Sequence, residues 1–161
     1  MITSPDDTGA LPMNRWLLAC LLVLSLSATA LAAPAADFDQ TLRTHLQAIT
    51  DRDLPTLLDT VSERADFSVI FPNGQRLVGK AAFEAMHTEW FADPDWRMSF
   101  EEISRWQSDA MAGVLLRYDY RDQPEPGSGN PRQRFLFLLF QLIDGQWLLV
   151  HDQNTPIAPP Q

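Results

Sequence analysis

The sequence contains only one cysteine among 161 residues. This residue, Cys20, lies in an apolar segment near the N-terminus, so the chain beyond it can form neither an internal disulfide nor a thiol active site. Basic clusters are also missing, because the chain has 12 lysines and arginines against 21 aspartates and glutamates, a net charge of −9. An acidic chain without a basic patch is not expected to bind nucleic acid or an anionic membrane surface.

Several motifs of enzymatic chemistry are absent from the sequence as well. It has no glycine-rich phosphate loop, no nucleophile elbow and no zinc-ligand spacing. The three histidines, His45, His87 and His151, fall on different predicted elements, so we expect no bound metal and no cofactor. Glu84 and His87 have the spacing of half a di-iron helix motif, but no second copy exists.

The N-terminal segment has the pattern of a secretory signal peptide. Arg15 precedes an apolar run over residues 16–26, and small residues follow, with Ala30 and Ala32 placed as in a small-x-small cleavage site. The run is shorter than the roughly 20 residues that cross a bilayer. We therefore predict a signal peptide over residues 1–32, cleaved after Ala32, and a periplasmic or secreted protein with no membrane attachment after cleavage.

Two details of this segment leave alternatives open. Residues 1–12 carry two aspartates and no basic residue, which favours Met13 as the true start of translation. Cys20 superficially resembles a lipoprotein cysteine, but most of the apolar run follows it rather than precedes it. Residues 33–161 have the length of a single domain with one core.

Apolar residues at helical spacing predict three helices. The first covers residues 37–49, and the second begins after Asp53, which can cap it, with Pro55 in its first turn. The third covers residues 80–91 and follows two short strands. Four longer strands follow the third helix, with a loop over residues 123–131 and a hairpin turn at Asp144-Gly145. The predicted strands are residues 67–71, 75–78, 96–106, 110–122, 132–143 and 144–156.

This order predicts an α+β fold with helices on one face of an antiparallel sheet. Residues 132–143 are apolar on both faces, so both sides of that strand should be buried. Because helices can cover only one side, a second copy of the chain is the simplest cover for the other. We therefore expect a homodimer that forms through the sheet.

The sequence resembles the nuclear transport factor 2-like superfamily, in its SnoaL-like and ketosteroid isomerase-like branch. The matching phrases are a D-x-D turn at residues 51–53, a strand ending in Phe-Pro-Asn-Gly at 71–74, Gly-Lys at 79–80, and a last strand of the type W-x-I-x-H-x-H-x-S. The resemblance covers about residues 37–156. Two positions depart from the last phrase, since Gln153 stands where the family often has a second histidine and Thr155 stands for serine.

The resemblance implies a cone-shaped α+β barrel, in which three N-terminal helices pack on a strongly curved antiparallel sheet and leave a cavity open at one end. Members often dimerise through the sheet. Some are isomerases, cyclases or dehydratases, and many only bind ligands, so the fold does not determine the function.

The last strand provides the first candidate site residues. Regular alternation places Trp147, Leu149, His151 and Gln153 on one face, as a wall that runs from a core to a polar pocket. His151 is a candidate general base, because a neutral histidine can move protons near neutral pH. Trp147 and Gln153 are candidate ligand-binding residues. Alternatively, His151 forms a hydrogen bond to a neighbouring strand or helix.

Asp119 is a second candidate catalytic base. It lies between Tyr118 and Tyr120, and ketosteroid isomerases use a carboxylate with a tyrosine hydroxyl. Alternation places Asp119 opposite the tyrosines, so they share a cavity only if a bulge intervenes. Otherwise, Arg117, Asp119 and Arg121 form a solvated or intersubunit charged face.

The third helix adds His87 and Trp90 as candidate ligand-binding residues, together with Tyr118 on its strand. His45 is expected to be packed or at the rim of the apolar face. The tryptophans of the domain either fill the cone or line an apolar cavity with a few polar groups.

Three hypotheses follow. The first is an exported domain that binds a small apolar molecule in a cone-shaped pocket. The second is an isomerase or cyclase that uses His151 or Asp119 as general base. The third is a dimerisation module whose cavity is filled by its own aromatic side chains.

Overall fold

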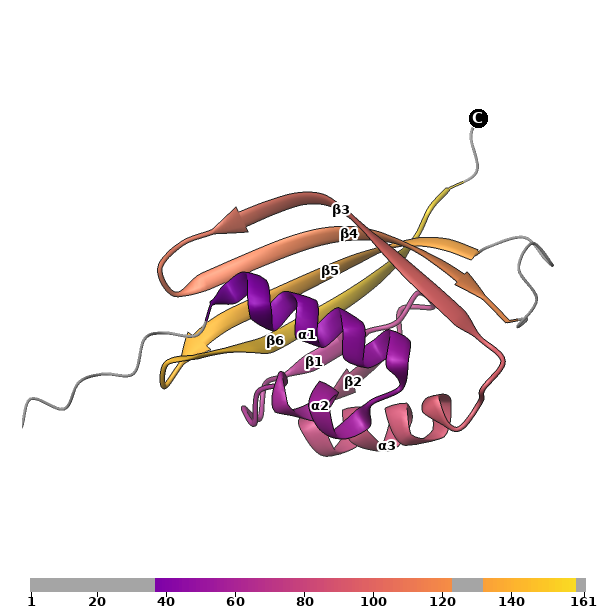
Figure 1. Ribbon diagram of the computed structural model, residues 1–161, viewed down its shortest axis with the longest axis horizontal. Coiled ribbons are helices and arrows are strands. Elements are labelled where there is room, and N and C mark those ends of the chain that lie inside the picture. Colours follow the sequence, from indigo (N-terminus) through magenta and orange to yellow (C-terminus); the bar gives the residue numbers. More distant parts are fainter. Residues whose placement is uncertain (1–36, 123–131, 159–161) are drawn as a thin grey trace, which may run out of the picture. The chain divides into compact units, whose positions relative to one another are not determined.

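The computed structural model describes residues 37–122 and 132–158 (Figure 1). The predicted signal peptide, with its alternatives at Met13 and Cys20, and the predicted loop over 123–131 lie outside these residues. Within the described ranges, no helix is long and apolar enough to cross a membrane.

Two capped helices begin the fold. Helix α1 spans Phe38–Asp51, and the carboxylate of Asp37 accepts the backbone N–H of Asp39 at 3.0 Å. Helix α2 spans Leu54–Asp59, and the carboxylate of Asp53 accepts the backbone N–H of Thr56 at 3.1 Å. Each cap supplies a partner for a backbone donor that the first turn of a helix leaves unbonded. The predicted cap at Asp53 is confirmed.

Arg52, between these helices, ties the end of α1 to a segment far along the chain. Its guanidinium donates to the backbone carbonyls of Asp93, Pro94 and Trp96 at 2.6–3.1 Å. It also lies 4.1 Å from the ring centre of Trp96, within cation–π range. Because Pro94 and Trp96 follow α3 (Lys80–Phe91), these bonds join α1 to the segment that leads from α3 into the sheet.

A six-stranded sheet forms the second layer, in the order β2-β1-β6-β5-β4-β3. All neighbouring strands are antiparallel except β1 and β6, which are parallel. The sheet curves around the helices, and α1 lies along its concave face (Figure 1). This arrangement confirms the predicted α+β fold. The strands are β1 (Ser68–Ile70), β2 (Arg76–Val78), β3 (Arg97–Gln107), β4 (Met111–Arg121), β5 (Arg132–Ile143) and β6 (Gln146–Pro156).

The core lies between the concave face and the helices. Alternate residues of β4 and β5 point into it, such as Val114 and Leu116 on β4 and Leu138 and Phe140 on β5. The ring of Phe38 on α1 packs against Phe140 at 5.4 Å between ring centres. Burial of such side chains is the main favourable term in folding, at about 1.5–3 kcal/mol for each large one.

Two register shifts interrupt the regular alternation of the long strands. In β3, Glu102 and Ser104 pair with consecutive residues of β4, so Ile103 is extra. In β6, Leu149 and His151 pair with consecutive residues of β5, so Val150 is extra. Beyond such a bulge, every following side chain is on the opposite face from that predicted by simple alternation.

The outer side of the sheet carries an apolar surface, which we call the outer apolar face and define as Trp106, Met111, Phe137 and Leu139. Trp106 is 58% exposed and Met111 is 43% exposed. Gly113 lies beneath them, and a Cβ atom there would come within 2.9 Å of the Phe137 ring. Simple alternation along β3 would place Trp106 on the same side as Met98 and Phe100, but the bulge at Ile103 turns it outward.

Candidate functional site

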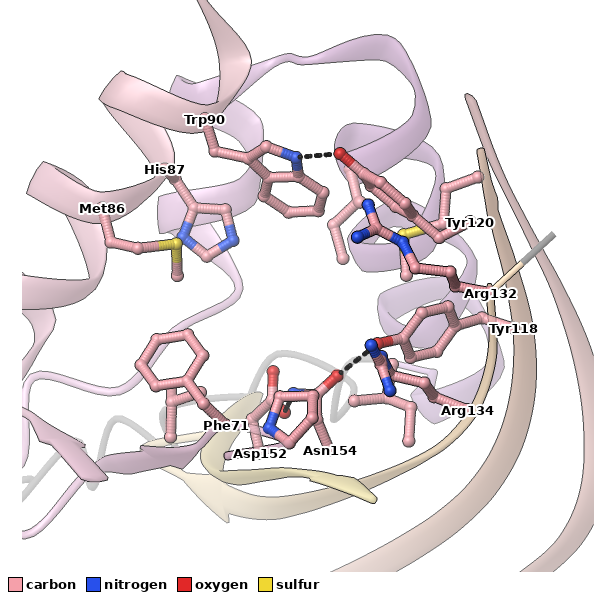
Figure 2. Close-up of a pocket in the computed structure, with 15 residues that line it drawn as sticks. Phe71, Met86, His87, Trp90, Tyr118, Tyr120, Arg132, Arg134, Asp152 and Asn154 are labelled. Carbon is pink, nitrogen blue, oxygen red and sulfur yellow. Dashed lines mark hydrogen bonds between the residues drawn. The ribbon is translucent and has the colours of Figure 1, made fainter. Parts of the chain in front are cut away.

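A pocket of about 300 Å³ opens between α3 and the concave face of the sheet (Figure 2). This volume is at the small end of the range for ligand sites in proteins. Its walls come from α1, α3 and five of the strands, so the whole domain contributes to one site. The lining residues are Ile49, Val69, Phe71, Pro72, Met86, His87, Trp90, Met98, Tyr118, Tyr120, Arg132, Arg134, Leu136, Asp152 and Asn154.

Aromatic packing fixes one wall of the pocket. The indole of Trp90 stacks on Trp96 with 4.6 Å between ring centres and an interplanar angle of 22°. Its N–H donates to the hydroxyl of Tyr120 at 3.3 Å, which connects α3 to β4 across the opening (Figure 2). Stacking of this geometry adds about 0.5–1.5 kcal/mol beyond area burial. Trp90 is therefore held as a fixed apolar surface that faces the cavity.

Polar groups on the opposite wall form a short chain of hydrogen bonds. The hydroxyl of Tyr118 donates to Oδ1 of Asn154 at 3.0 Å, and Nδ2 of Asn154 donates to Oδ1 of Asp152 at 2.8 Å. Burial raises the pKa of Asp152 to about 7, because a charged carboxylate is poorly solvated in apolar surroundings. At neutral pH this carboxyl therefore exists in both protonation states.

His87 presents a neutral imidazole to the same cavity. Its Nδ1 lies 2.9 Å from the carbonyl oxygen of Phe83 and must donate, since a carbonyl can only accept. The other ring nitrogen, Nε2, faces the open space of the pocket (Figure 2). Burial lowers the pKa of His87 to about 4, so Nε2 carries no proton at neutral pH and acts as a hydrogen-bond acceptor.

Two arginines of β5 stand at the sheet side of the pocket with different partners. Arg132 donates to both carboxylate oxygens of Asp122 at 2.5 and 2.6 Å and lies over the ring of Tyr120. Arg134 is half-buried and makes no hydrogen bond or ion pair with any residue that the structure describes. Its charge nevertheless lowers the pKa of Tyr118 against the larger effect of burial, which raises that pKa to about 12.

Three of the predicted site residues come together in this pocket, namely His87, Trp90 and Tyr118. Trp147 does not line it, because its ring packs in the core against Phe38 at 5.2 Å between ring centres. Of the tryptophans within the described ranges, only Trp90 is part of the pocket wall. The pocket therefore stays open beside the aromatic core.

The predicted common face of Trp147, His151 and Gln153 is wrong, because the bulge at Val150 reverses the alternation. The register pairs His151 with Leu139 and Gln153 with Phe137, both on the outer side of the sheet. Nδ1 of His151 lies 3.1 Å from Oγ of Ser68 on β1. This contact agrees with the alternative prediction of a hydrogen bond to a neighbouring strand.

Asp119 lies on the outer side of the sheet as well. Its carboxylate accepts a hydrogen bond from Nε2 of Gln133 at 2.8 Å, and β4 has no bulge that would bring it beside Tyr118. Arg117 on the same side forms an ion pair with Glu101. This arrangement agrees with the alternative of a charged outer face.

Sequence alternation did not predict three of the polar residues that line the pocket, namely Asp152, Asn154 and Arg134. Asp152 and Asn154 alternate with His151 and Gln153, so a one-residue shift exchanges the two pairs. Arg134 lies on the same side of β5 as the buried residues Leu136 and Leu138. Because the residues after it are apolar on both sides of the strand, the sequence does not indicate which side faces the core. The sequence predicts the pocket residues correctly only on β4, where alternation is regular, and on α3, where the helical period is regular.

The described residues contain no group of three or more histidine, cysteine, aspartate or glutamate side chains arranged to hold a metal ion. The site instead combines an apolar wall, a carboxyl with a pKa of about 7, a neutral imidazole acceptor and a guanidinium that has no partner in the described part of the chain. Such a site can hold an apolar molecule in one orientation, and it can accept or return a proton.

Comparisons with known proteins give a family and a fold. The sequence profile of the SnoaL-like domain family matches residues 42–150. A comparison with curated protein sequences finds no match. Among solved structures, a ketosteroid isomerase-like protein from Erwinia carotovora has a TM-score of 0.60 at 19% identity, covering 75% of this chain and 94% of that one.

Two further structures agree with this fold. A candidate dehydratase of the nuclear transport factor 2-like family from Streptomyces avermitilis has a TM-score of 0.64 at 14% identity, covering 75% of this chain and 94% of that one. A candidate association domain of calcium/calmodulin-dependent protein kinase type II from Thiobacillus denitrificans has a TM-score of 0.67 at 13% identity, covering 78% and 99%. At these identities the likeness concerns the fold alone.

Proposed function

This chain belongs to the SnoaL-like domain family, and we propose that it binds a small, largely apolar molecule that carries a polar group. The observation that supports this function is the pocket of about 300 Å³, in which Trp90, Met86 and Leu136 provide apolar walls. Asp152 and His87 are among the polar residues that line the same space (Figure 2).

The two kinds of wall have separate roles in binding. Removing apolar ligand surface from water contributes about 25 cal/mol per Å², which supplies affinity without direction. The polar groups supply orientation, because a ligand hydroxyl or amide left unpaired in such a site costs about 1–3 kcal/mol. Asp152 and Nε2 of His87 are two of the groups available for this purpose.

Calorimetric titration with two neutral probes, octanamide and 2-naphthamide, tests the binding function. We expect binding to the wild-type protein and a loss of about tenfold or more in Trp90→Ala, because the flat apolar wall disappears. Trp106→Ala is the matched control, since it removes an indole from the outer apolar face. Met86→Ala is a milder second variant. Failure of both probes to bind, or equal losses in the Trp90 and Trp106 variants, would contradict the proposal.

Asp152 favours a second candidate function, proton transfer at carbon, as in an isomerase or dehydratase. An ionised Asp152 would take a proton from the carbon beside a carbonyl group and later return it, so no other reactant is needed. A base works best when its pKa lies near the working pH, as the pKa of about 7 does here. Tyr118 keeps its hydroxyl proton and can donate to the oxygen of the enolate.

Proton exchange of 1-indanone in D₂O, followed by NMR, tests this second function. The wild-type protein should speed the loss of the α-proton signal, with a rate that rises with pH through about 7, because the ionised carboxylate is the base. Asp152→Asn should abolish the effect. His151→Ala is the control, since His151 lies on the other side of the sheet, and a loss of exchange in that variant would overturn the assignment to Asp152.

We further propose that two copies pair through the outer apolar face, whose exposed Trp106 and Met111 a second copy would remove from water. Export through the N-terminal signal peptide is likewise a proposal. N-terminal sequencing of the exported protein tests it, and a first residue other than Ala33 would contradict the predicted cleavage after Ala32.

A further inference from the structure

Arg134, on the wall of an apolar pocket, is a cation that has no partner among residues 37–122 and 132–158. Its neighbour Arg132 is neutralised by the two bonds to Asp122, whereas Arg134 makes no ion pair or hydrogen bond within the described part of the chain. A half-buried guanidinium has five N–H donors and loses water contacts, so an unpaired one is costly to keep. The N–H donors of Arg134 are therefore available to a ligand in the pocket.

The register of the sheet places these donors at one end of the pocket. Arg134 stands four residues before Leu138, the residue of β5 that pairs with Asp152. At about 3.3 Å per residue, the two levels are about 13 Å apart along the strand. Arg132, two residues earlier, is exposed, so the arginine end is the open end and Asp152 lies deeper.

We propose that the ligand carries a carboxylate group, which Arg134 binds at the mouth of the pocket while the apolar body of the ligand extends inward along Trp90 and Leu136. This proposal rests on the proposed binding function and names its ligand class. The planar fork of a guanidinium matches the two oxygens of a carboxylate, and such charge-assisted pairs are among the stronger hydrogen bonds in proteins.

The groups around Arg134 favour a ligand with a single negative charge at the mouth of the pocket. The hydroxyl of Tyr118, which pairs with Arg134 across β4 and β5, donates its one proton to Asn154, so Arg134 supplies the donors for an anion at this level. Asp152 is the one acidic side chain that lines the pocket among the described residues, and it is separated from Arg134 by the level of Asn154. The mouth is therefore cationic, while the interior is apolar with a single carboxyl.

The test compares two probes of matched shape, octanoate and octanamide, by calorimetric titration at pH 6.0 and low ionic strength. We expect octanoate to bind wild-type protein about 10- to 100-fold more tightly than octanamide, the gain typical of a charge-assisted bond. The advantage of octanoate should shrink as salt is added.

Substitutions at the mouth then assign this difference to Arg134. In Arg134→Gln, the affinity for octanoate should fall to that for octanamide, which itself should change less than about twofold. Arg134→Lys should recover part of the difference, since it keeps the charge but loses the fork. Arg121→Gln is the matched control, because alternation along β4 places Arg121 on the outer side.

The outcomes separate the two proposals. Equal binding of octanoate and octanamide to wild-type protein, or an octanoate advantage that survives in Arg134→Gln, would overturn the carboxylate proposal and leave the binding function intact. If neither octanoate, octanamide nor 2-naphthamide binds at millimolar concentration, the proposed function fails as well. The comparison of the two probes on wild-type protein needs no variant, so it remains decisive even if a variant does not fold.

Discussion

The carboxyl group of Asp152 lowers the stability of the folded protein when it is ionised, because it is buried beside the pocket. Its pKa rises from 3.8 in a solvated chain to about 7 in the folded protein, so the folded state binds the proton more tightly than the unfolded state. Stability from this group is therefore fully present below pH 4 and declines as the pH rises through about 7. The charged and titratable groups around its cavity are His87, Tyr118, Tyr120, Arg132 and Arg134.

Asp152→Asn should therefore stabilise the protein in alkaline but not in acidic solution. An asparagine keeps an oxygen for the bond from Asn154 and carries no charge to desolvate. We expect a gain on the order of 1–3 kcal/mol at pH 8, less than the full shift implies because Asp152 is partly exposed to the cavity, and almost none at pH 4. His87 does not interfere above pH 5, since it stays neutral.

Urea unfolding of wild-type and variant proteins between pH 4 and pH 9 measures this difference. Asp119→Asn is the matched control, because it removes a carboxylate from the outer side of the sheet. A stability difference between wild type and Asp152→Asn that does not change with pH would show that Asp152 titrates normally.

The bulge in β6 decides which polar residues face the pocket. Val150 is the residue without an opposite partner, so Asp152 and Asn154 point inward and His151 and Gln153 outward. A strand without glycine or proline at this position gives no local signal of a bulge, and the same holds for Ile103 in β3. Tertiary packing of the curved sheet determines these shifts, which sequence alternation alone could not predict.

In α3 and β4 the sequence pattern predicts the side-chain directions correctly, because no bulge or break interrupts these elements. Helix α3 keeps its period over its whole length, so His87 and Trp90 fall on the inner side as their spacing predicts. Strand β4 pairs regularly with β5, so Tyr118 and Asp119 lie on opposite sides as alternation requires. The site residues found from the sequence come from these two regular elements.

Deletion of Val150 tests whether the bulge alone sets the orientation of β6. Without this residue, Leu149 and His151 become neighbours and still pair with consecutive residues of β5, so Asp152 remains in the pocket. We expect a folded protein of lower stability, since the bend of the strand is lost, whose stability still declines between pH 5 and pH 8. Val150→Ala, which keeps the bulge, is the control. Loss of that decline in the deletion variant alone would mean that Asp152 had left the pocket.

At the scale of the whole molecule, the outer apolar face predicts self-association. Trp106 and Phe137 meet there at 6.4 Å between ring centres, and Leu139 and Met111 extend the surface. A charge in the middle of such a face would have to be buried in a dimer, at a cost of several kcal/mol.

Light scattering at micromolar concentration should therefore report a dimer for wild-type protein and a monomer for Trp106→Glu. Val78→Glu is the control, because Val78 is 45% exposed but lies on β2, at the other edge of the sheet. A wild-type monomer, or a dimer that persists in Trp106→Glu, would contradict pairing through this face.

The parallel pairing of β1 with β6 has a consequence for the order of folding. Ser68 and His151, which meet in this pair, are 83 residues apart in sequence. During synthesis β1 is made early, and one of its edges stays unpaired until β6, the last strand within the described residues, has been made. Contacts so distant slow folding and leave an unpaired edge exposed to other chains meanwhile. A nascent chain of this protein therefore keeps that edge of β1 unpaired until β6 has emerged from the ribosome.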